Sequence, residues 1–157
     1  MSWRKLDGTR ILLPIVEAVE AVIKKEKELG NSLRICIGTD SQVRGQSDIT
    51  FATVIVFLRE GKGGYMYIST EHIHRPMSLK ERMIHEVGLS VGIAYEIADL
   101  LVDNKIPLEV HADINSDASF KSNVALKEAM GYIMGMGYEF KAKPHAFASS
   151  ACADKVC

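Results

Sequence analysis

The feature that most constrains the fold is a set of three consecutive β-prone segments. Residues 33–40, 50–59 and 65–73 are rich in β-branched and aromatic residues, and short polar connections join them. Connections this short link antiparallel neighbours, whereas parallel strands need a crossover of a dozen or more residues. The three segments therefore predict an antiparallel meander at the centre of the fold.

Helical signals lie on both sides of this meander. Apolar residues recur at helical spacing over residues 11–30, with Pro14 in the first turn and Gly30 as the stop. After Pro76, residues 78–81 read Ser-Leu-Lys-Glu, which is a capping box. We expect this box to open a long helix that ends near residue 102.

The rest of the chain alternates between strand and helix patterns. The predicted elements are a strand over residues 108–114, a helix over 119–136, a strand over 138–143 and a helix over 147–157. The complete order is α, β, β, β, α, β, α, β, α, which is an α/β pattern. The sequence shows no repeat, low-complexity tract or linker, so we expect one domain over residues 1–157.

Bulk composition excludes several classes of protein. The chain has 19 basic and 20 acidic residues and a net charge of −1, which argues against a strongly basic protein that coats nucleic acid. The three cysteines are odd in number and form no CxxC pair, as expected of a reducing compartment. The absence of a long apolar run and of a phosphate loop predicts a cytoplasmic protein without a membrane partner or a nucleotide cofactor.

Four acidic residues stand in places where carboxylates are uncommon. Asp40 ends the first strand, Glu86 precedes buried positions of the long helix, Asp113 lies within a strand, and Asp154 follows an almost uncharged run. Clustered carboxylates repel one another unless a cation neutralises them, and oxygen ligands suit Mg²⁺ or Mn²⁺. Two such ions about 3.5–4 Å apart activate water and stabilise the leaving oxygen of a phosphodiester.

Three stretches of the sequence stand out together: IGTDSQ at residues 37–42, HADIN at residues 111–115, and KPHAFASS at residues 143–150, which runs on to Asp154. In these stretches the chain resembles the YkuK family of predicted ribonuclease H-like nucleases. The resemblance covers about residues 11–157. It implies a ribonuclease H-like fold: a five-stranded mixed sheet, three antiparallel strands first, flanked by helices. The helix over residues 11–30 is then an N-terminal addition.

The resemblance also implies the metal ligands. That fold places acidic ligands on the first strand, the following helix, the fourth strand and the last helix. This assigns a metal-binding and catalytic role to Asp40, Asp113 and Asp154. On the long helix Glu86 is favoured, because it lies deeper than Glu81 and beside the small residues Gly88 and Ser90. Glu81 remains the alternative, although it has a structural role in the capping box.

Several other residues of these stretches are expected to contact a ligand residue or the substrate. They are Ser41, Gln42, His111, Asn115, Lys143 and His145. By strand alternation His111 and Asn115 share a face with Asp113. Plainer interpretations stay open: Asp40 and Asp113 as turn residues that bond their own backbone, and Asp154 as an exposed helix residue.

Together these patterns predict a nuclease that uses one or two Mg²⁺ or Mn²⁺ ions on RNA, RNA–DNA hybrid or structured DNA. Nucleic acid is the expected partner. A catalytically silent ribonuclease H-like module that binds nucleic acid or protein is the first alternative, because a fold does not fix a function. A small-molecule phosphoesterase that uses the same carboxylates is the second.

Overall fold

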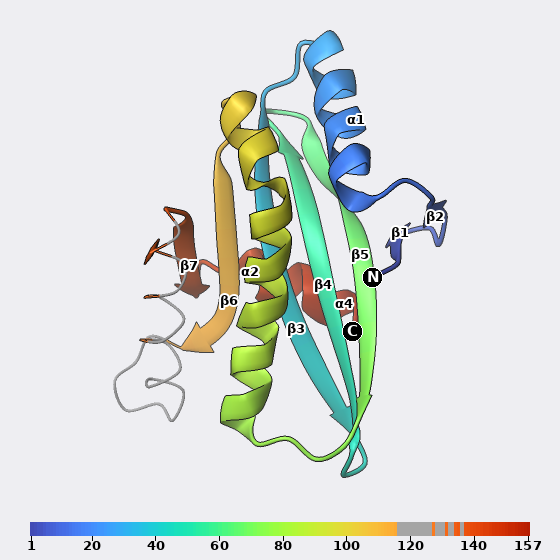
Figure 1. Cartoon of the computed structure of the whole chain (residues 1–157), viewed down its shortest axis with the longest axis vertical. Helices are drawn as coiled ribbons and strands as arrows, with labels where there is room; N and C mark the ends of the chain where they lie inside the picture. Colours follow the sequence, from blue (N-terminus) through green and yellow to red (C-terminus); the bar gives the residue numbers. More distant parts are fainter. Residues whose placement is uncertain (116–126, 128–130, 132–133, 136) are drawn as a thin grey trace.

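A seven-stranded mixed sheet forms the centre of the molecule (Figure 1). The computed structural model describes residues 1–115, 127, 131, 134–135 and 137–157. The strands are β1 (Trp3–Lys5), β2 (Arg10–Ile11), β3 (Leu33–Arg44), β4 (Asp48–Arg59), β5 (Gly63–His74), β6 (Leu108–Asn115) and β7 (Glu139–Lys143). Their order in the sheet is β2-β1-β5-β4-β3-β6-β7.

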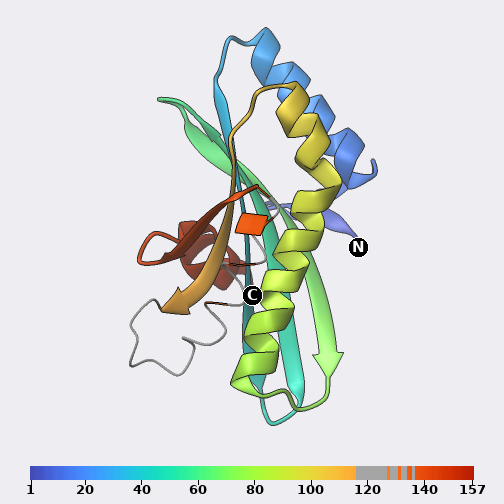
Figure 2. The same cartoon turned by 60° about the vertical axis from the view of Figure 1, so that its left-hand side comes forward.

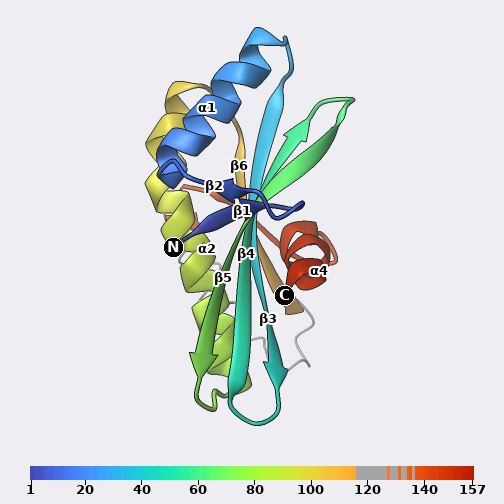
Figure 3. The same cartoon turned by 90° about the vertical axis from the view of Figure 1, so that its right-hand side faces the viewer.

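Helices cover both faces of this sheet. They are α1 (Ile15–Glu28), α2 (Leu79–Asp103), a π-helix called η1 (Ala148–Ala153) and α4 (Asp154–Val156). Viewed along the sheet, α1 and α2 lie on one side and α4 lies on the other (Figure 3). None of the helices in the described ranges is long and apolar enough to cross a membrane.

The predicted meander is confirmed. β3 pairs with β4 from Leu33–Arg59 to Arg44–Asp48, and β4 pairs with β5 along its whole length, both antiparallel. β6 then adds to β3 in the parallel sense, and β7 adds to β6 likewise. The long helix between β5 and β6 supplies the crossover that a parallel neighbour requires.

The sheet has seven strands rather than the five that the sequence predicts. The additional pair is β1 and β2, in which Trp3 pairs with Ile11 and Arg4 pairs with Ile68 of β5. Strands of two and three residues are too short to show a period, and most of their residues are polar. Trp3 is nevertheless buried, so its ring fixes this hairpin against the core.

Two predicted helices differ in extent from the sequence interpretation. The first begins at Ile15 rather than at residue 11, because β2 occupies Arg10–Ile11 and Pro14 takes the N-cap position with an extended backbone. The last is a π-helix followed by one short α-helical turn rather than a single α-helix over residues 147–157. The helix predicted over residues 119–136 lies for the most part outside the described residues.

The capping box that opens α2 is confirmed. The backbone N–H of Glu81 donates to Ser78 Oγ at 3.1 Å, and the Ser78 N–H donates to Glu81 Oε1 at 3.5 Å.

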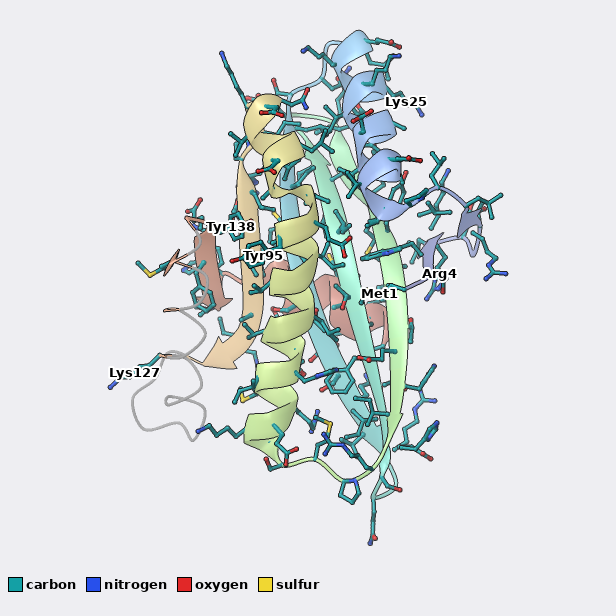
Figure 4. The ribbon with its side chains drawn as sticks, viewed as in Figure 1. Met1, Arg4, Lys25, Tyr95, Lys127 and Tyr138 are labelled. Atoms are coloured by element: carbon teal, nitrogen blue, oxygen red, sulfur yellow. The ribbon has the colours of Figure 1, made fainter. Side chains whose placement is uncertain are left out.

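A contact of Tyr138, just before β7, also involves α2. The Tyr138 hydroxyl donates to the Ala94 carbonyl of α2 at 3.2 Å. Figure 4 places Tyr138 beside α2, so this contact ties the β7 edge to the helix layer.

Alternation along β3 decides which side chains meet which helix layer. Ile35 and Ile37 belong to the core between the sheet and helices α1 and α2. Cys36 faces the opposite way and packs with Ala148 and Ala153 of the C-terminal segment. The candidate site residues that follow in β3 continue this alternation.

A buried carboxylate fastens α1 to the sheet. Glu26 is 2% exposed and accepts hydrogen bonds from Asn31 Nδ2 at 2.7 Å and from the Tyr65 hydroxyl at 2.9 Å. These hydrogen bonds, that of Asn31 first, hold the pKa of Glu26 below its usual value in spite of its burial.

We expect Glu26→Gln to lower the free energy of unfolding by about 1–2 kcal/mol near neutral pH, the usual contribution of such hydrogen bonds. Because the folded-state pKa is depressed, the contribution is complete above the unfolded pKa of about 4.3 and is lost as pH falls through the folded-state value. Urea titrations from about pH 7 to pH 3 should therefore show the difference shrinking in acid. Exposed Glu28→Gln is the control and should match wild type throughout.

Candidate functional site

The candidate site lies where the parallel ladder between β3 and β6 ends. The last pair of this ladder is Thr39 with Ala112, and Asp40 and Asp113 are the next residues of the two strands. Beyond this point β3 continues beside β4 to Arg44, and Figure 1 shows the β3–β5 strands extending past the end of β6. Two sequence-predicted carboxylate residues therefore start from neighbouring backbone positions.

Asp40 is buried, with 8% of its surface exposed. Strand alternation puts its side chain on the same face of β3 as Gly38, the face that η1 and α4 cover. The thiol of Cys157 donates to the carbonyl oxygen of Asp40 at 3.4 Å and to that of Thr50 at 3.0 Å. These contacts fix the end of α4 over the strand position that carries Asp40.

Burial raises the pKa of the Cys157 thiol to about 11, and the Asp40 carboxylate adds to the effect. The Glu86 carboxylate acts on Cys157 in the same direction, though more weakly. Both acidic residues are therefore near enough to the thiol to disfavour a further negative charge.

Glu86 reaches the site from the other face of the sheet. It is buried in α2, with 7% of its surface exposed, and its Oε1 accepts a hydrogen bond from Ser41 Oγ at 2.5 Å. One helical turn later Ser90 Oγ is hydrogen-bonded to Thr39 Oγ1 at 2.7 Å. Two successive polar contacts thus hold α2 against β3. Gly88, expected to aid this approach, is instead exposed.

Glu81, the alternative ligand on this helix, is occupied elsewhere. Its carboxylate pairs with Arg75 at 3.1 Å and accepts from the backbone N–H of Ser78. The hydrogen bond from Arg75, followed by that from Ser78, holds the pKa of Glu81 below its usual value. These contacts place Glu81 at the exposed N-terminus of α2, one turn before the buried Glu86.

Sequence reasoning missed Arg82, which also contacts Ser41. Its Nε donates to Ser41 Oγ at 3.1 Å, and its Nη2 donates to Ser41 Oγ at 3.0 Å and to the Ser41 carbonyl at 3.2 Å. A charged residue early in a helix is usually solvated, so the sequence alone gave no reason to select it. The one available signal was that Arg82 lies four residues before Glu86, because residues four apart in a helix share a face.

Asp154 is exposed in the first turn of α4. It is three residues before Cys157, whose backbone N–H donates to the Asp154 carbonyl at 3.4 Å. The same short turn thus carries Asp154 and the thiol that contacts the backbone of Asp40. Figure 2 shows this C-terminal segment packed beside β6 and β3.

The other predicted residues lie on β3, on β6, at the end of β7 and just after it. Asn115 pairs with Lys143 across β6 and β7, while the side chains of Asp113 and Asn115 lie outside the described part of the structure. Gln42 is half-buried on β3 and pairs with Thr50. Lys143 and His145 are exposed.

His111 holds η1 against the sheet. The Ala148 backbone N–H donates to His111 Nδ1 at 3.1 Å, which leaves the proton on Nε2, where it faces Glu109 Oε1 at 3.3 Å. Burial lowers the pKa of His111, so the neutral ring is favoured. This ring is therefore a structural link from β6 to the segment that precedes Asp154.

Cys36, Glu109 and His111 place one ligand-type atom each within 4.8 Å of one another. Arg34 already pairs with Glu109 at 3.1 Å, and burial, followed by the Glu109 charge, raises the pKa of the Cys36 thiol to about 12. A metal ion here would have to displace Arg34 and the protons of both the thiol and His111 Nε2. We interpret this cluster as structural, because Glu109 is paired with His111 and Arg34 and Cys36 is buried among apolar side chains.

Comparison with known families places this arrangement in context. A family model described as Ribonuclease H-like matches residues 14–157. The chain belongs to the ribonuclease H-like family. This match confirms the resemblance to the YkuK family that the three sequence stretches carry. No curated protein matches the chain.

The ribonuclease H-like assignment relates the four acidic residues to the fold. They lie on the first strand of the meander, the following helix, the next strand and the last helix: Asp40 on β3, Glu86 on α2, Asp113 on β6 and Asp154 on α4. The oxygen donors of buried Asp40 and Glu86 fit a hard divalent cation such as Mg²⁺ or Mn²⁺.

Proposed function

We propose that this protein is a divalent-metal-dependent nuclease that hydrolyses phosphodiester bonds of RNA, RNA–DNA hybrids or structured DNA. The observation that carries the proposal is the burial of two carboxylates, Asp40 and Glu86, at the end of the β3–β6 ladder of a ribonuclease H-like chain.

The burial of these two carboxylates supports a cation-binding role. Burial of an ionised carboxylate costs on the order of several kcal/mol of hydration free energy in proteins. Hydrogen-bond partners or cations must compensate for this cost. Asp40 and Glu86 lie on neighbouring elements and both raise the pKa of Cys157. A divalent cation that both groups reach at the end of the β3–β6 ladder would offset their negative charge.

We assign the ion or ions to Asp40, Glu86, Asp113 and Asp154. A bound Mg²⁺ or Mn²⁺ would supply Lewis acidity and charge stabilisation for attack on phosphorus. The protein would supply the orientation of the ligands. Ser41 donates to Glu86 Oε1 and so fixes the rotation of that carboxylate.

Exposed residues beside this point would take up the substrate. Lys143 and His145 are exposed in the segment that joins β7 to η1, and Gln42 is half-buried on β3. These side chains offer hydrogen-bond donors to phosphate and sugar groups. The thiols Cys36, Cys152 and Cys157 are free, in keeping with the reducing cytoplasm in which we propose that the protein acts.

The test is a cleavage assay with Mn²⁺ and then Mg²⁺ on labelled single-stranded RNA, RNA–DNA hybrid, duplex DNA and branched DNA, with p-nitrophenyl phosphate as a small ester. We expect a polynucleotide to be cut and chelator to stop the reaction. Turnover of the small ester alone would favour a phosphoesterase. If no substrate is cut and Mn²⁺ does not raise the melting temperature, the proposal is wrong and a silent binding module is favoured.

A further inference from the structure

Arg82 occupies a place beside the candidate site that the four carboxylates do not explain. It lies on α2 one helical turn before Glu86 and is half-buried. All three of its hydrogen bonds in the described part of the chain go to Ser41, two to Oγ and one to the carbonyl oxygen. One edge of the guanidinium group is therefore anchored to β3, next to Asp40.

The Ser41 hydroxyl connects this arginine to Glu86. It accepts from Arg82 Nε and Nη2 and donates its single proton to Glu86 Oε1. A hydroxyl has one proton, so the direction of this chain of hydrogen bonds is fixed. The guanidinium is consequently held in one orientation beside the carboxylate.

Among the described residues Arg82 forms no direct ion pair with a carboxylate, and it reaches Glu86 only through the Ser41 hydroxyl. The arginine ion pairs found there join Arg34 to Glu109 and Arg75 to Glu81, and Arg82 belongs to neither. Its described contacts use Nε and Nη2, whereas a guanidinium carries five N–H donors, two of them on Nη1. An arginine with one edge anchored and one pair of donors remaining suits an anionic ligand.

We propose that Arg82 contacts a phosphate group of the substrate, beside the phosphodiester that the carboxylate site acts on. This inference rests on the proposed nuclease function. Anchoring by Ser41 lowers the conformational entropy lost when the phosphate binds, because the side chain is already ordered. Arg82 would then be a substrate-binding residue, and Ser41 would position both Arg82 and Glu86.

The experiment compares Arg82→Gln and Arg82→Lys with Arg75→Gln. Arg75 is the matched control, because it is an exposed arginine near the start of the same helix whose charge is paired with Glu81. Binding of a fluorescein-labelled single-stranded RNA is measured by anisotropy with Ca²⁺ in place of Mn²⁺, at several salt concentrations. Cleavage kinetics are measured separately. A Mn²⁺ titration followed by the melting temperature gives the Mn²⁺ midpoint, which is the concentration at half-maximal stabilisation, and thermal melting without metal reports the fold of each variant.

We expect Arg82→Gln to raise Kd and KM by about tenfold to a hundredfold, the usual loss for a hydrogen bond to a charged group, with kcat within about threefold. The Mn²⁺ concentration at half-maximal stabilisation should not change. The slope of log Kd against log salt concentration should fall by about 1. The Kd of Arg82→Lys should lie between those of wild type and Arg82→Gln, since lysine keeps the positive charge but lacks the planar guanidinium that can donate two parallel hydrogen bonds. Arg75→Gln should bind like wild type.

Three results would overturn the inference. Unchanged RNA binding in Arg82→Gln would do so whether or not the protein cuts RNA. A fall in kcat and in Mn²⁺ affinity at unchanged KM would show that Arg82 only positions Glu86 through Ser41. A wild-type chain that neither binds nor cuts the nucleic acids would refute the nuclease proposal, and the inference with it.

Discussion

The Asp40→Asn variant is expected to lose divalent-dependent cleavage by on the order of a hundredfold or more. Changes to residues that only support a metal ligand already cost about 10–100-fold in metal affinity or activity. Removal of the charge from a ligand should cost at least as much. The measurement is the initial cleavage rate on the best wild-type substrate as a function of Mn²⁺ concentration.

Folding should survive this change. Asparagine has nearly the same shape as aspartate, and Asp40 is 8% exposed, so the substitution leaves no cavity. Removal of a buried charge also removes its desolvation cost. We expect the metal-free variant to melt within a few degrees of wild type. Wild type should gain about 2.7 kcal/mol at a Mn²⁺ concentration a hundredfold above its dissociation constant, and the variant should not.

Asp48→Asn provides the control. Asp48 lies at the start of β4, is exposed, and pairs with His74 at 2.8 Å, so the same change of charge is made outside the carboxylate group. The control should cut and bind Mn²⁺ like wild type. If Asp40→Asn also behaves like wild type, the assignment of Asp40 as a metal ligand is wrong.

Local signals in the sequence were sufficient to predict much of the fold. The meander follows from β-branched runs joined by short connections, and β3 and β4 pair without interruption. The start of α2 follows from a capping box whose two hydrogen bonds the structure contains. Both features depend on residues close together in the chain, where propensity and spacing are informative.

Contacts between distant residues could not be predicted in this way. Ser41 meets Arg82 and Glu86, which are 41 and 45 positions away in the sequence. The sequence suggested Ser41 and Glu86 separately, through the family resemblance, and gave no sign of Arg82. The length and tilt of α2 over β3 decide which of its residues meet the strand, and these are set by packing of the whole core.

The C-terminal segment shows the same limit. A helix was predicted over residues 147–157, but six of these residues form a π-helix, which is rare and often occurs at functional sites. This segment contacts β3 and β6, because His111 accepts from the backbone N–H of Ala148 and Gly38 lies against the same residue. Neither contact can be predicted from the local sequence, because each joins residues far apart in the chain.

Gly38 gives the second large expected effect. A Cβ at this position would lie 2.5 Å from the carbonyl carbon of Ala148 and 2.5 Å from the nitrogen of Ser149. Real Cβ atoms do not approach backbone this closely, so Gly38→Ala must push η1 away from β3. We expect the free energy of unfolding to fall by about 1–3 kcal/mol or more, as for other overpacked cores.

The functional consequence of Gly38→Ala should exceed its effect on stability. Displacement of η1 would break the hydrogen bond from the Ala148 N–H to His111 and would move α4, which carries Asp154. If Asp154 is a ligand, Mn²⁺ affinity should fall by about 10–100-fold, the loss typical of a disturbed ligand set. The measurements are urea unfolding and a Mn²⁺ titration followed by the melting temperature.

Gly64→Ala separates strain from this functional effect. A Cβ there would lie 2.6 Å from the carbonyl oxygen of Phe57, a comparable clash on the β4–β5 pair, where no candidate ligand lies among the described residues. It should lower stability and leave the Mn²⁺ midpoint unchanged. Equal losses of Mn²⁺ affinity in both variants would mean that general destabilisation is responsible. A Gly38→Ala protein with wild-type stability and affinity would show that η1 does not rest on β3 in solution.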